Sequence, residues 1–146
     1  MSKRFVIHEH HATRLHFDLR LEIGGVLKSW AVPKGVSMNP QEKRLAVAVP
    51  DHSLGYINFE GTLAEGTYGA GEVRIWDNGE FEFVGDAEEQ LRKGKLIFTF
   101  YGKKLRGEFT IVKMWNQPKN WLVIKSKDEY ANENWKLQTV LEPQRK

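Results

Sequence analysis

The sequence predicts a mainly β fold, either an antiparallel barrel or a sandwich, with one short helix. Three observations lead to this prediction: a strictly alternating apolar and polar segment, frequent glycine and proline turn signals, and many further short apolar runs. Hydrophobic residues make up 40% of the 146 residues and aromatic residues 12%, which is enough to bury a core. The length fits one domain. We expect this domain over residues 1–127, followed by a polar segment over 128–146 that packs on it or stays partly loose.

The alternating segment covers residues 15–23 and is expected to form a strand with one apolar and one polar face. Gly24-Gly25 supplies a tight turn, and residues 26–32 return as the second strand of a hairpin. Burial of the apolar face should fix the register of this strand, because a slip of one residue would turn its polar side chains into the core.

Further along the chain, the sequence indicates one helix and several more strands. Asp86 can cap the helix, Glu89 lies three residues further on as in a capping box, and Gly94 can end it. Asn78-Gly79 is expected to form a type I′ hairpin turn. The remaining strands are expected at residues 44–49, 57–63, 72–76, 80–84, 95–100, 107–113 and 121–125.

Charge and cysteine content narrow the classes of function. The 22 basic and 19 acidic residues give a formal net charge of +3, which permits a phosphate-bearing partner without requiring one. The chain has no cysteine, which excludes disulfides, cysteine-ligated metals and thiol nucleophiles. No apolar run approaches the length of a membrane span, and the first apolar stretch is too short for a signal peptide. We therefore expect a cytoplasmic protein without membrane contact.

The histidines gather near one end of the sequence. Four of the five lie within nine residues, at positions 8, 10, 11 and 16. His16, Asp18 and Arg20 share the polar face of the alternating strand, about 7 Å apart from one to the next. Such a face is usually only the solvated side of a sheet, and an Asp–Arg pair on it a weak surface ion pair.

A bend after the first histidines would turn this polar face into a site. Ala12-Thr13 lies between His10 and His16 and indicates such a bend. His10 would then return beside His16 and Asp18, placing two imidazoles and one carboxylate around a divalent cation. This donor set suits Mn²⁺, Fe²⁺ or Zn²⁺ and leaves positions open for water or substrate.

Several further residues suit the binding of a phosphate beside such a metal. The guanidinium of Arg20 can clamp a phosphate or carboxylate with two hydrogen bonds. Lys34, Arg44 and His52 lie at loop or strand-end positions, and Tyr56 follows four residues after His52. A metal, an arginine, a histidine and a tyrosine are what phosphoester hydrolysis needs. By spacing alone, Lys34, Arg44 and Tyr56 are more often solvated or structural.

Seven ordered motifs carry a resemblance that covers the chain from about residue 5 to residue 127. They are FVIHEH (5–10), LHFDLRLE (15–22), LKSWAVPKG (27–35), KRLAV (43–47), DHSLGY (51–56), FEG (59–61) and YGAG (68–71). The chain resembles the phosphoesterase domain of bacterial DNA ligase D and its free-standing archaeal relatives. This resemblance implies a compact antiparallel β-barrel with one short helix.

The resemblance also implies an activity and its residues. It implies a manganese-dependent 3′-phosphoesterase of non-homologous end joining DNA repair, with other divalent transition metals as alternatives. Such an enzyme removes 3′-terminal ribonucleotides as a phosphodiesterase and 3′-phosphates as a phosphomonoesterase, leaving a 3′-OH. The implied metal ligands are His10, His16 and Asp18. The implied catalytic residues around the scissile phosphate are Arg20, His52 and Tyr56, and Lys34 and Arg44 are implied to support substrate binding through phosphate contacts.

The sequence departs from the family pattern in two places. His8 stands where a polar amide residue is expected, so its role is open. Only four residues precede Phe5, where the bacterial domain has an acidic segment that supports the diesterase step. We therefore expect monoesterase activity more firmly than diesterase activity.

The implied partners are the 3′ ends of primer–template DNA or RNA, and a DNA ligase or polymerase on a separate chain. We expect a monomer. Two other classes of function stay open. Two histidines and a carboxylate on a barrel also describe a non-haem Fe(II) oxygenase. The aromatic residues and mild positive charge would also suit a non-catalytic nucleic-acid-binding barrel.

Overall fold

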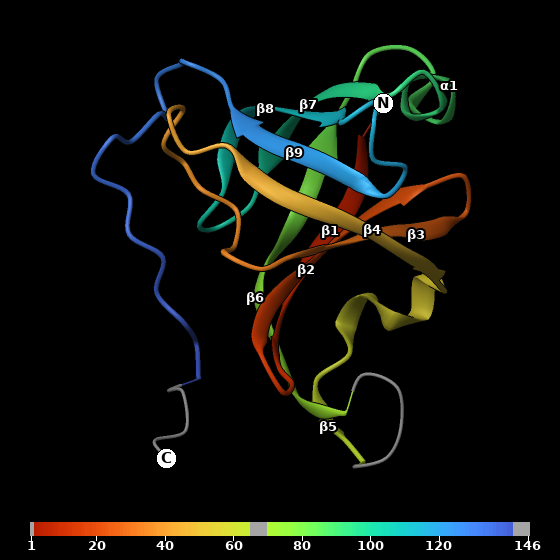
Figure 1. The fold of residues 1–146 in the computed structure, drawn as a ribbon, viewed down its shortest axis with the longest axis vertical. Helices are drawn as coiled ribbons and strands as arrows, with labels where there is room; N and C mark the ends of the chain where they lie inside the picture. Colours follow the sequence, from red (N-terminus) through yellow and green to blue (C-terminus); the bar gives the residue numbers. More distant parts are fainter. Residues whose placement is uncertain (1, 65–69, 142–146) are drawn as a thin grey trace.

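The computed structural model describes residues 2–64 and 70–141, so the motif at 68–71 lies partly outside the described residues. Nine strands and two short helices follow one another along the chain (Figure 1). They are β1 (Ser2–His11), β2 (Leu15–Ile23), β3 (Val26–Val32), β4 (Arg44–His52), the 3₁₀ helix η1 (Leu54–Asn58), β5 (Gly61–Leu63), β6 (Gly71–Glu82), α1 (Ala87–Arg92), β7 (Lys95–Tyr101), β8 (Arg106–Lys113) and β9 (Asn120–Lys125).

The strands form a closed antiparallel barrel. Their order is β1-β2-β3-β4-β9-β8-β7-β6, and β6 returns to pair with β1, so eight strands close the sheet on itself. The short strand β5 adds only to one end of β6. Closure removes the unpaired edges that an open sheet would expose. The prediction of a mainly β fold is confirmed, and the architecture is the barrel with one short α-helix among the described residues.

The hairpin of β2 and β3 forms as its sequence predicts. Gly24 and Gly25 take φ angles of 65° and 80°, which glycine adopts without strain. The two-residue turn sets the register, so that Arg20 lies opposite Ser29. Along β2, Phe17 and Leu19 face the interior, and the polar residues between them face outward. Burial of the apolar face therefore holds the polar face in one orientation.

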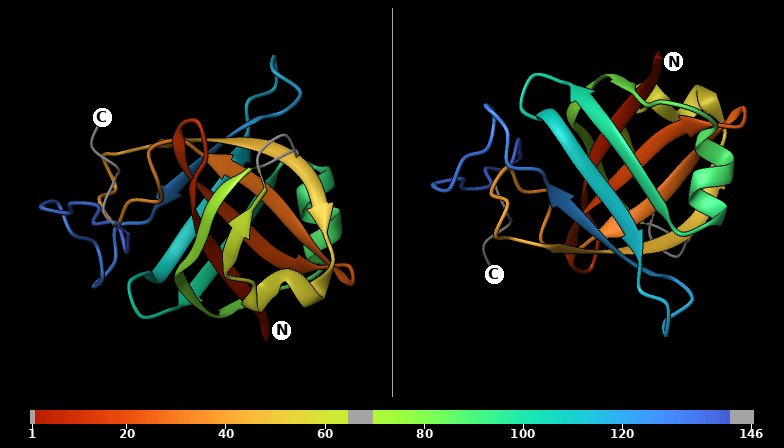
Figure 2. Two further views of the ribbon diagram at one scale, coloured as in Figure 1. Left: turned by 90° about the horizontal axis from the view of Figure 1, so that it is seen from below. Right: turned by 90° about the horizontal axis from the view of Figure 1, so that it is seen from above.

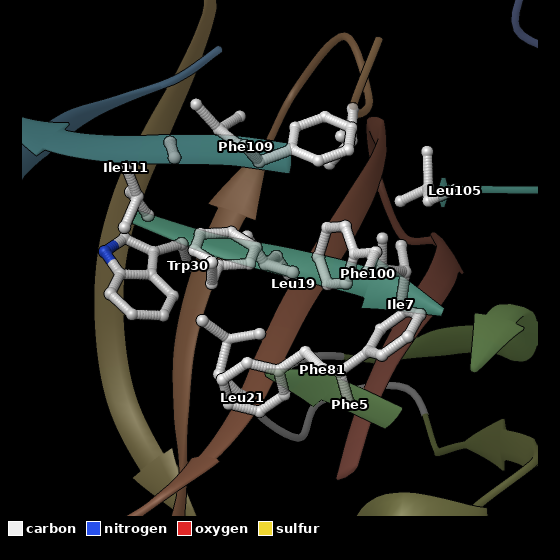
Figure 3. Close-up of a cluster of buried hydrophobic side chains, with 14 of the residues drawn as sticks. Phe5, Ile7, Leu19, Leu21, Trp30, Phe81, Phe100, Leu105, Phe109 and Ile111 are labelled. Atoms are coloured by element: carbon white, nitrogen blue, oxygen red, sulfur yellow. The ribbon is translucent and has the colours of Figure 1, made fainter. Parts of the chain in front are cut away.

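The interior of the barrel is rich in aromatic side chains. Figure 3 shows residues from β1, β2, β3, β6, β7 and β8 packed together in this core. The largest fully buried side chains include Trp76, Phe5, Phe17, Phe81, Phe98, Phe100 and Phe109. Several of these rings meet edge to face, as Phe98 and Phe100 do with centroids 4.9 Å apart. This packed core is a rigid scaffold for the side chains on the outer face.

Two neighbouring residues of β7 offer a direct test of this packing. Leu96 is fully buried in the core, whereas Ile97 on the opposite face is 45% exposed. Leu96→Ala is expected to lower the free energy of unfolding by about 2–5 kcal/mol, because a cavity would replace its side chain. Ile97→Ala, the matched control, is expected to lower it by less than about 1 kcal/mol. Urea titrations of both variants measure the difference, and equal losses would contradict the inward assignment of Leu96.

The predicted helix is present as α1. The Asp86 side chain accepts a hydrogen bond from the Glu89 backbone N–H at 3.2 Å, and Gly94 after the helix has a φ angle of 92°. Seen from both ends in Figure 2, α1 lies on one side of the barrel and the C-terminal segment on the other. No helix in the described part of the chain is long and apolar enough to cross a membrane.

The strand predicted at 57–63 is wrong over its first half. Residues 54–58 form η1, and only Gly61–Leu63 pair as a strand. Leu54 and Ile57 are three residues apart, so one turn of a 3₁₀ helix points both at the same side. There they pack with Val6 and Leu27 in a small cluster separate from the main core.

The hairpin turn predicted at Asn78-Gly79 is also wrong, because both residues lie inside the continuous strand β6. Gly79 has a φ angle of 152°, and a Cβ atom there would lie 2.4 Å from the carbonyl oxygen of Tyr101. This glycine therefore permits a close approach of β6 to the end of β7. The sequence signal was real, but it marks a strand contact and not a turn.

The segment after β9 contains turns and bends but no regular element among its described residues. It contacts the rest of the protein at several places, two of them on β6 and β1. The indole of Trp135 meets Trp76 edge-on, with centroids 6.2 Å apart. The backbone N–H groups of Val140 and Leu141 donate to the buried carboxylate of Glu9 at 2.7 and 2.9 Å. These contacts hold the described part of this segment against β1 and β6.

Candidate active site

A group of polar side chains in mutual contact lies on the outer face of β1 and β2. The two strands pair antiparallel, with His8 opposite Asp18 and His10 opposite His16. The bend at residues 12–14 makes this pairing possible, because it turns the chain back on itself. Figure 1 shows the two strands side by side. The sequence prediction that His10 returns beside His16 therefore describes the geometry correctly, although β1 itself was not predicted as a strand.

Three side chains form a compact donor cluster. His10 Nδ1 lies 3.4 Å from Asp18 Oδ2, and His16 Nε2 lies 3.3 Å from Asp18 Oδ1. One donor atom from each residue falls within 4.8 Å of the other two. His10 and Asp18 are buried, and His16 is half-buried. Two imidazole nitrogens and a carboxylate oxygen this close together fit a divalent transition metal.

The contacts within the cluster shift the pKa values of Asp18 and His16 in the metal-free protein. Burial alone would raise the pKa of Asp18, but hydrogen bonds from His10 and His16 and the charge of Arg20 hold it well below its ordinary value. Burial would likewise lower the pKa of His16, but the hydrogen bond and charge of Asp18 outweigh this and raise it. The carboxylate is therefore ionised, and the His16 ring readily takes a proton.

The guanidinium of Arg20 is fixed beside this cluster. It is 4% exposed and lies 3.4 Å from Asp18 through Nη2. Its Nη1 donates to Ser29 Oγ at 2.9 Å and lies 3.2 Å from His52 Nδ1. Its Nε donates to His8 Nδ1 at 3.1 Å. Contacts to three strands thus set both the position and the plane of the guanidinium.

His52 and Tyr56 lie next to Arg20. The His52 and Tyr56 rings have centroids 4.8 Å apart, and the Arg20 Cζ atom lies 5.1 Å from the Tyr56 ring centroid. Burial and then the charge of Arg20 lower the pKa of His52, and burial raises the pKa of Tyr56. Both side chains are therefore neutral at pH 7. The end of β4 and the following η1 turn place them there.

Lys34 and Arg44 take other positions. Lys34 lies in the exposed turn after β3. Arg44 begins β4, about 26 Å along the strand from His52 at its other end. Its guanidinium pairs with Glu42 at 3.2 Å, and its place in the strand alternation is that of the core residue Ala46. Phosphate contacts of Lys34 and Arg44 stay predictions, and the structure places Arg44 away from the Arg20–His52 pair.

The sequence did not predict a role for His8 or Ser29, which contact Arg20 through its Nε and Nη1 atoms. His8 on β1 is fully buried. One of its ring nitrogens contacts Arg20 at 3.1 Å, and the other contacts the Phe59 carbonyl oxygen at 3.0 Å. Burial and then the charge of Arg20 lower the pKa of His8 to about 4, so the ring is neutral. Ser29 was not singled out, although the Gly24-Gly25 turn gives the register that sets it opposite Arg20.

The chain is thus a closed antiparallel β-barrel that carries two histidines, one carboxylate and a fixed arginine together on its outer face. Residues 8–113 match a family model, the DNA Ligase D 3′-phosphoesterase domain. The chain therefore belongs to this family of 3′-phosphoesterase domains, as its motifs predicted. Phosphoester hydrolysis at a 3′ end is the class of activity that the family implies.

Sequence similarity to two named proteins supports this family assignment. The chain is 46% identical over 130 residues to the multifunctional non-homologous end joining protein LigD of Pseudomonas aeruginosa. It is 43% identical over 134 residues to the protein of the same name from Mycolicibacterium smegmatis. Each match covers 88% of this chain but only 16% and 17% of the relative. The chain thus spans about a sixth of the length of these multifunctional relatives.

Proposed function

We propose that the chain is a manganese-dependent 3′-phosphoesterase that acts on DNA or RNA 3′ ends and leaves a 3′-OH. Its substrates are 3′-phosphates, removed as a phosphomonoesterase, and 3′-terminal ribonucleotides, removed as a phosphodiesterase. One observation carries the proposal: donors of His10, His16 and Asp18 lie within 4.8 Å of one another, and Arg20 lies 3.4 Å from Asp18. The names of the relatives and of the family suggest that the reaction serves non-homologous end joining and is coupled to a DNA ligase.

The donor cluster fits the metal that the family implies. His10, His16 and Asp18 would hold the ion, since they offer two imidazole nitrogens and one anionic oxygen from a firmly paired strand hairpin. When bound, a divalent ion supplies positive charge that stabilises the developing charge on phosphoryl oxygens.

Arg20 supplies the second positive charge. Its guanidinium is buried, so its charge acts in a medium of lower effective dielectric than water. Its contacts to His8, Ser29 and Asp18 hold it in one orientation before substrate arrives, so little reorganisation is needed at the moment of reaction. These contacts support the proposal that Arg20 stabilises charge on the phosphate in the transition state.

His52 is arranged to present a donor to the phosphate. Its Nδ1 lies 3.2 Å from Arg20 Nη1 and 3.2 Å from the Pro50 carbonyl oxygen. An arginine N–H can only donate and a carbonyl oxygen can only accept, so these two neighbours favour opposite tautomers of the ring. In the tautomer whose Nδ1 accepts from Arg20, the proton lies on Nε2. That Nε2–H can bind a phosphoryl oxygen or protonate the leaving 3′-oxygen. The neutral Tyr56 hydroxyl beside it offers a second donor.

Product analysis tests the proposal directly. A labelled duplex whose primer ends in a 3′-phosphate or a 3′-ribonucleotide is incubated with the protein and each divalent metal, without oxygen. Release of phosphate or of the terminal nucleoside with Mn²⁺, and its loss with chelator, is the expected result. Iron-dependent oxygen uptake with a small co-substrate would support the oxygenase alternative. Chelator-resistant binding without any product would support a non-catalytic barrel.

Metal affinity is expected to rise with pH. The pKa of His16 is raised in the metal-free protein, so below that pKa the ring carries a proton that metal must displace. The apparent Mn²⁺ affinity should therefore fall by up to about tenfold per pH unit on the acid side and level off on the alkaline side. Calorimetric Mn²⁺ titrations from pH 5.5 to 8 in two buffers of different ionisation enthalpy measure both affinity and proton release. An affinity that stays constant over this range would contradict the prediction.

A further inference from the structure

We infer that His8 is a positioning residue that holds Arg20 and the segment carrying Tyr56 in one fixed arrangement. The inference rests on the proposed function, because the arrangement matters only if Arg20 and Tyr56 act on a phosphate. His8 lies on β1 and is fully buried. It shares the outer face with His10, two residues further on, but its contacts are different.

Both ring nitrogens of His8 are engaged. Nδ1 accepts a hydrogen bond from Arg20 Nε at 3.1 Å, and Nε2 lies 3.0 Å from the carbonyl oxygen of Phe59. The guanidinium N–H can only donate and the carbonyl can only accept, so these two partners fix the tautomer. The proton must lie on Nε2, and Nδ1 must be bare. Neither nitrogen is then available to bind a metal or to act as a general base.

The contact to Arg20 completes the support of the guanidinium. Ser29 Oγ accepts from Nη1 at 2.9 Å and in turn donates to the Leu27 carbonyl oxygen at 3.1 Å. Asp18 lies 3.4 Å from Nη2. With His8 on Nε, each nitrogen of the planar group has a partner, and the partners come from three neighbouring strands. Loss of His8 would remove this partner of a buried donor and allow the plane to turn.

The second contact joins this support to the other side of the site. Phe59, whose carbonyl oxygen accepts from His8, stacks on Tyr56 with ring centroids 4.7 Å apart and an interplanar angle of 11°. The His8 ring itself meets Tyr56 edge-on at 5.2 Å. His8 therefore links β1 to the segment after β4, 51 residues away in sequence, at the point where that segment faces Arg20.

Two substitutions separate the polar contacts from the volume of the ring. His8→Gln keeps one donor and one acceptor at the end of a neutral side chain, so it can bridge Arg20 and Phe59. His8→Phe keeps a ring against Tyr56 but removes both hydrogen bonds. With a 3′-phosphate primer and Mn²⁺, we expect His8→Phe to lower kcat by about 10- to 100-fold through misplacement of Arg20. We expect His8→Gln to restore activity to within a few-fold of the wild type.

A double-mutant cycle tests whether His8 acts through Arg20. If it does, the loss caused by His8→Phe should shrink to less than about twofold when Arg20→Ala is already present. Equal losses in both backgrounds would overturn the inference, as would a wild-type kcat in His8→Phe. His11→Phe on the same strand is the matched control. His11 contacts Glu9 and not Arg20, so this variant should stay within about twofold of the wild type.

Two measurements do not depend on turnover. The Mn²⁺ affinity of His8→Phe should equal that of the wild type, because His8 is not a ligand, and a large loss would show that His8 supports the metal site instead. Nitrogen-15 spectra of the wild-type imidazole should show His8 as the Nε2–H tautomer, and the Nδ1–H tautomer would overturn the geometry. If the wild type releases no phosphate, the proposed function fails, while the tautomer result still decides whether His8 bridges Arg20 and Phe59.

Discussion

Arg20→Ala is expected to lower kcat for release of a 3′-phosphate by about 10²–10³-fold, the usual loss when a fixed charge-stabilising donor is removed. The guanidinium is buried and held by His8, Ser29 and Asp18, so its charge is oriented before substrate binds. Water that entered the space left by the side chain would reorient too freely to replace it. Steady-state kinetics with a labelled 3′-phosphate primer and Mn²⁺ measure the loss.

Arg20→Lys should recover little of this activity. A lysine ammonium cannot donate to His8, Ser29 and a phosphate at once, because it lacks the planar fork of donors. Arg92→Ala on α1 is the matched control, since the Arg92 side chain is 72% exposed and pairs with Glu89 on the same helix. That variant should keep the wild-type rate. A fully active Arg20→Ala protein, or a fully active Arg20→Lys protein, would show that Arg20 does not stabilise the transition state.

The part of the site that lies on β2 could be predicted because apolar and polar residues alternate along this strand. Apolar residues such as Leu19 and Leu21 alternate strictly with polar ones, so burial of one face dictates where Asp18 and Arg20 point. The two-residue turn at Gly24-Gly25 even fixes the partner of Arg20 on β3. The pairing of Arg20 with Ser29 therefore follows from the predicted hairpin, although Ser29 was not among the predicted site residues.

β1 was harder to recognise, for a physical reason. Its residues 5–10 are all buried, so apolar and polar positions do not alternate as they do in a half-exposed strand. Phe5 and Ile7 fill the barrel interior, while His8 and His10 are buried on the outer face, His8 against Tyr56 of η1 and His10 against His16 of β2. A buried polar residue gives no periodic signal, and its role depends on which partners its rotamer reaches.

The role of His8 and the separation of Arg44 from His52 both required coordinates. His8 joins Arg20 to Phe59, which lies beyond a 3₁₀ turn that the sequence did not reveal. The strand expected at 44–49 leaves His52 outside it, and the structure shows that both residues belong to one longer strand, β4, at its opposite ends. Contacts between segments far apart in sequence depend on register and closure, which local patterns do not encode.

Asp18→Asn is expected to remove Mn²⁺ binding and with it nearly all phosphate release. An amide of the same shape is neutral, so the cluster would lose its anionic ligand and both imidazoles would lose their charged partner. The Mn²⁺ affinity should fall by at least about 100-fold, in line with the loss of a direct ligand. Calorimetry with Mn²⁺ alone measures this without substrate.

Thermal unfolding measures the loss of Mn²⁺ binding in Asp18→Asn independently of calorimetry. Metal that binds only the folded protein stabilises it in proportion to the logarithm of its concentration over Kd. Excess Mn²⁺ should therefore raise the Tm of the wild type but not that of Asp18→Asn. The exposed Glu88→Gln variant on α1 is the control and should respond as the wild type does. If Asp18→Asn still gained stability from Mn²⁺, the ion would bind elsewhere, because the carboxylate that contacts both His10 and His16 would be dispensable.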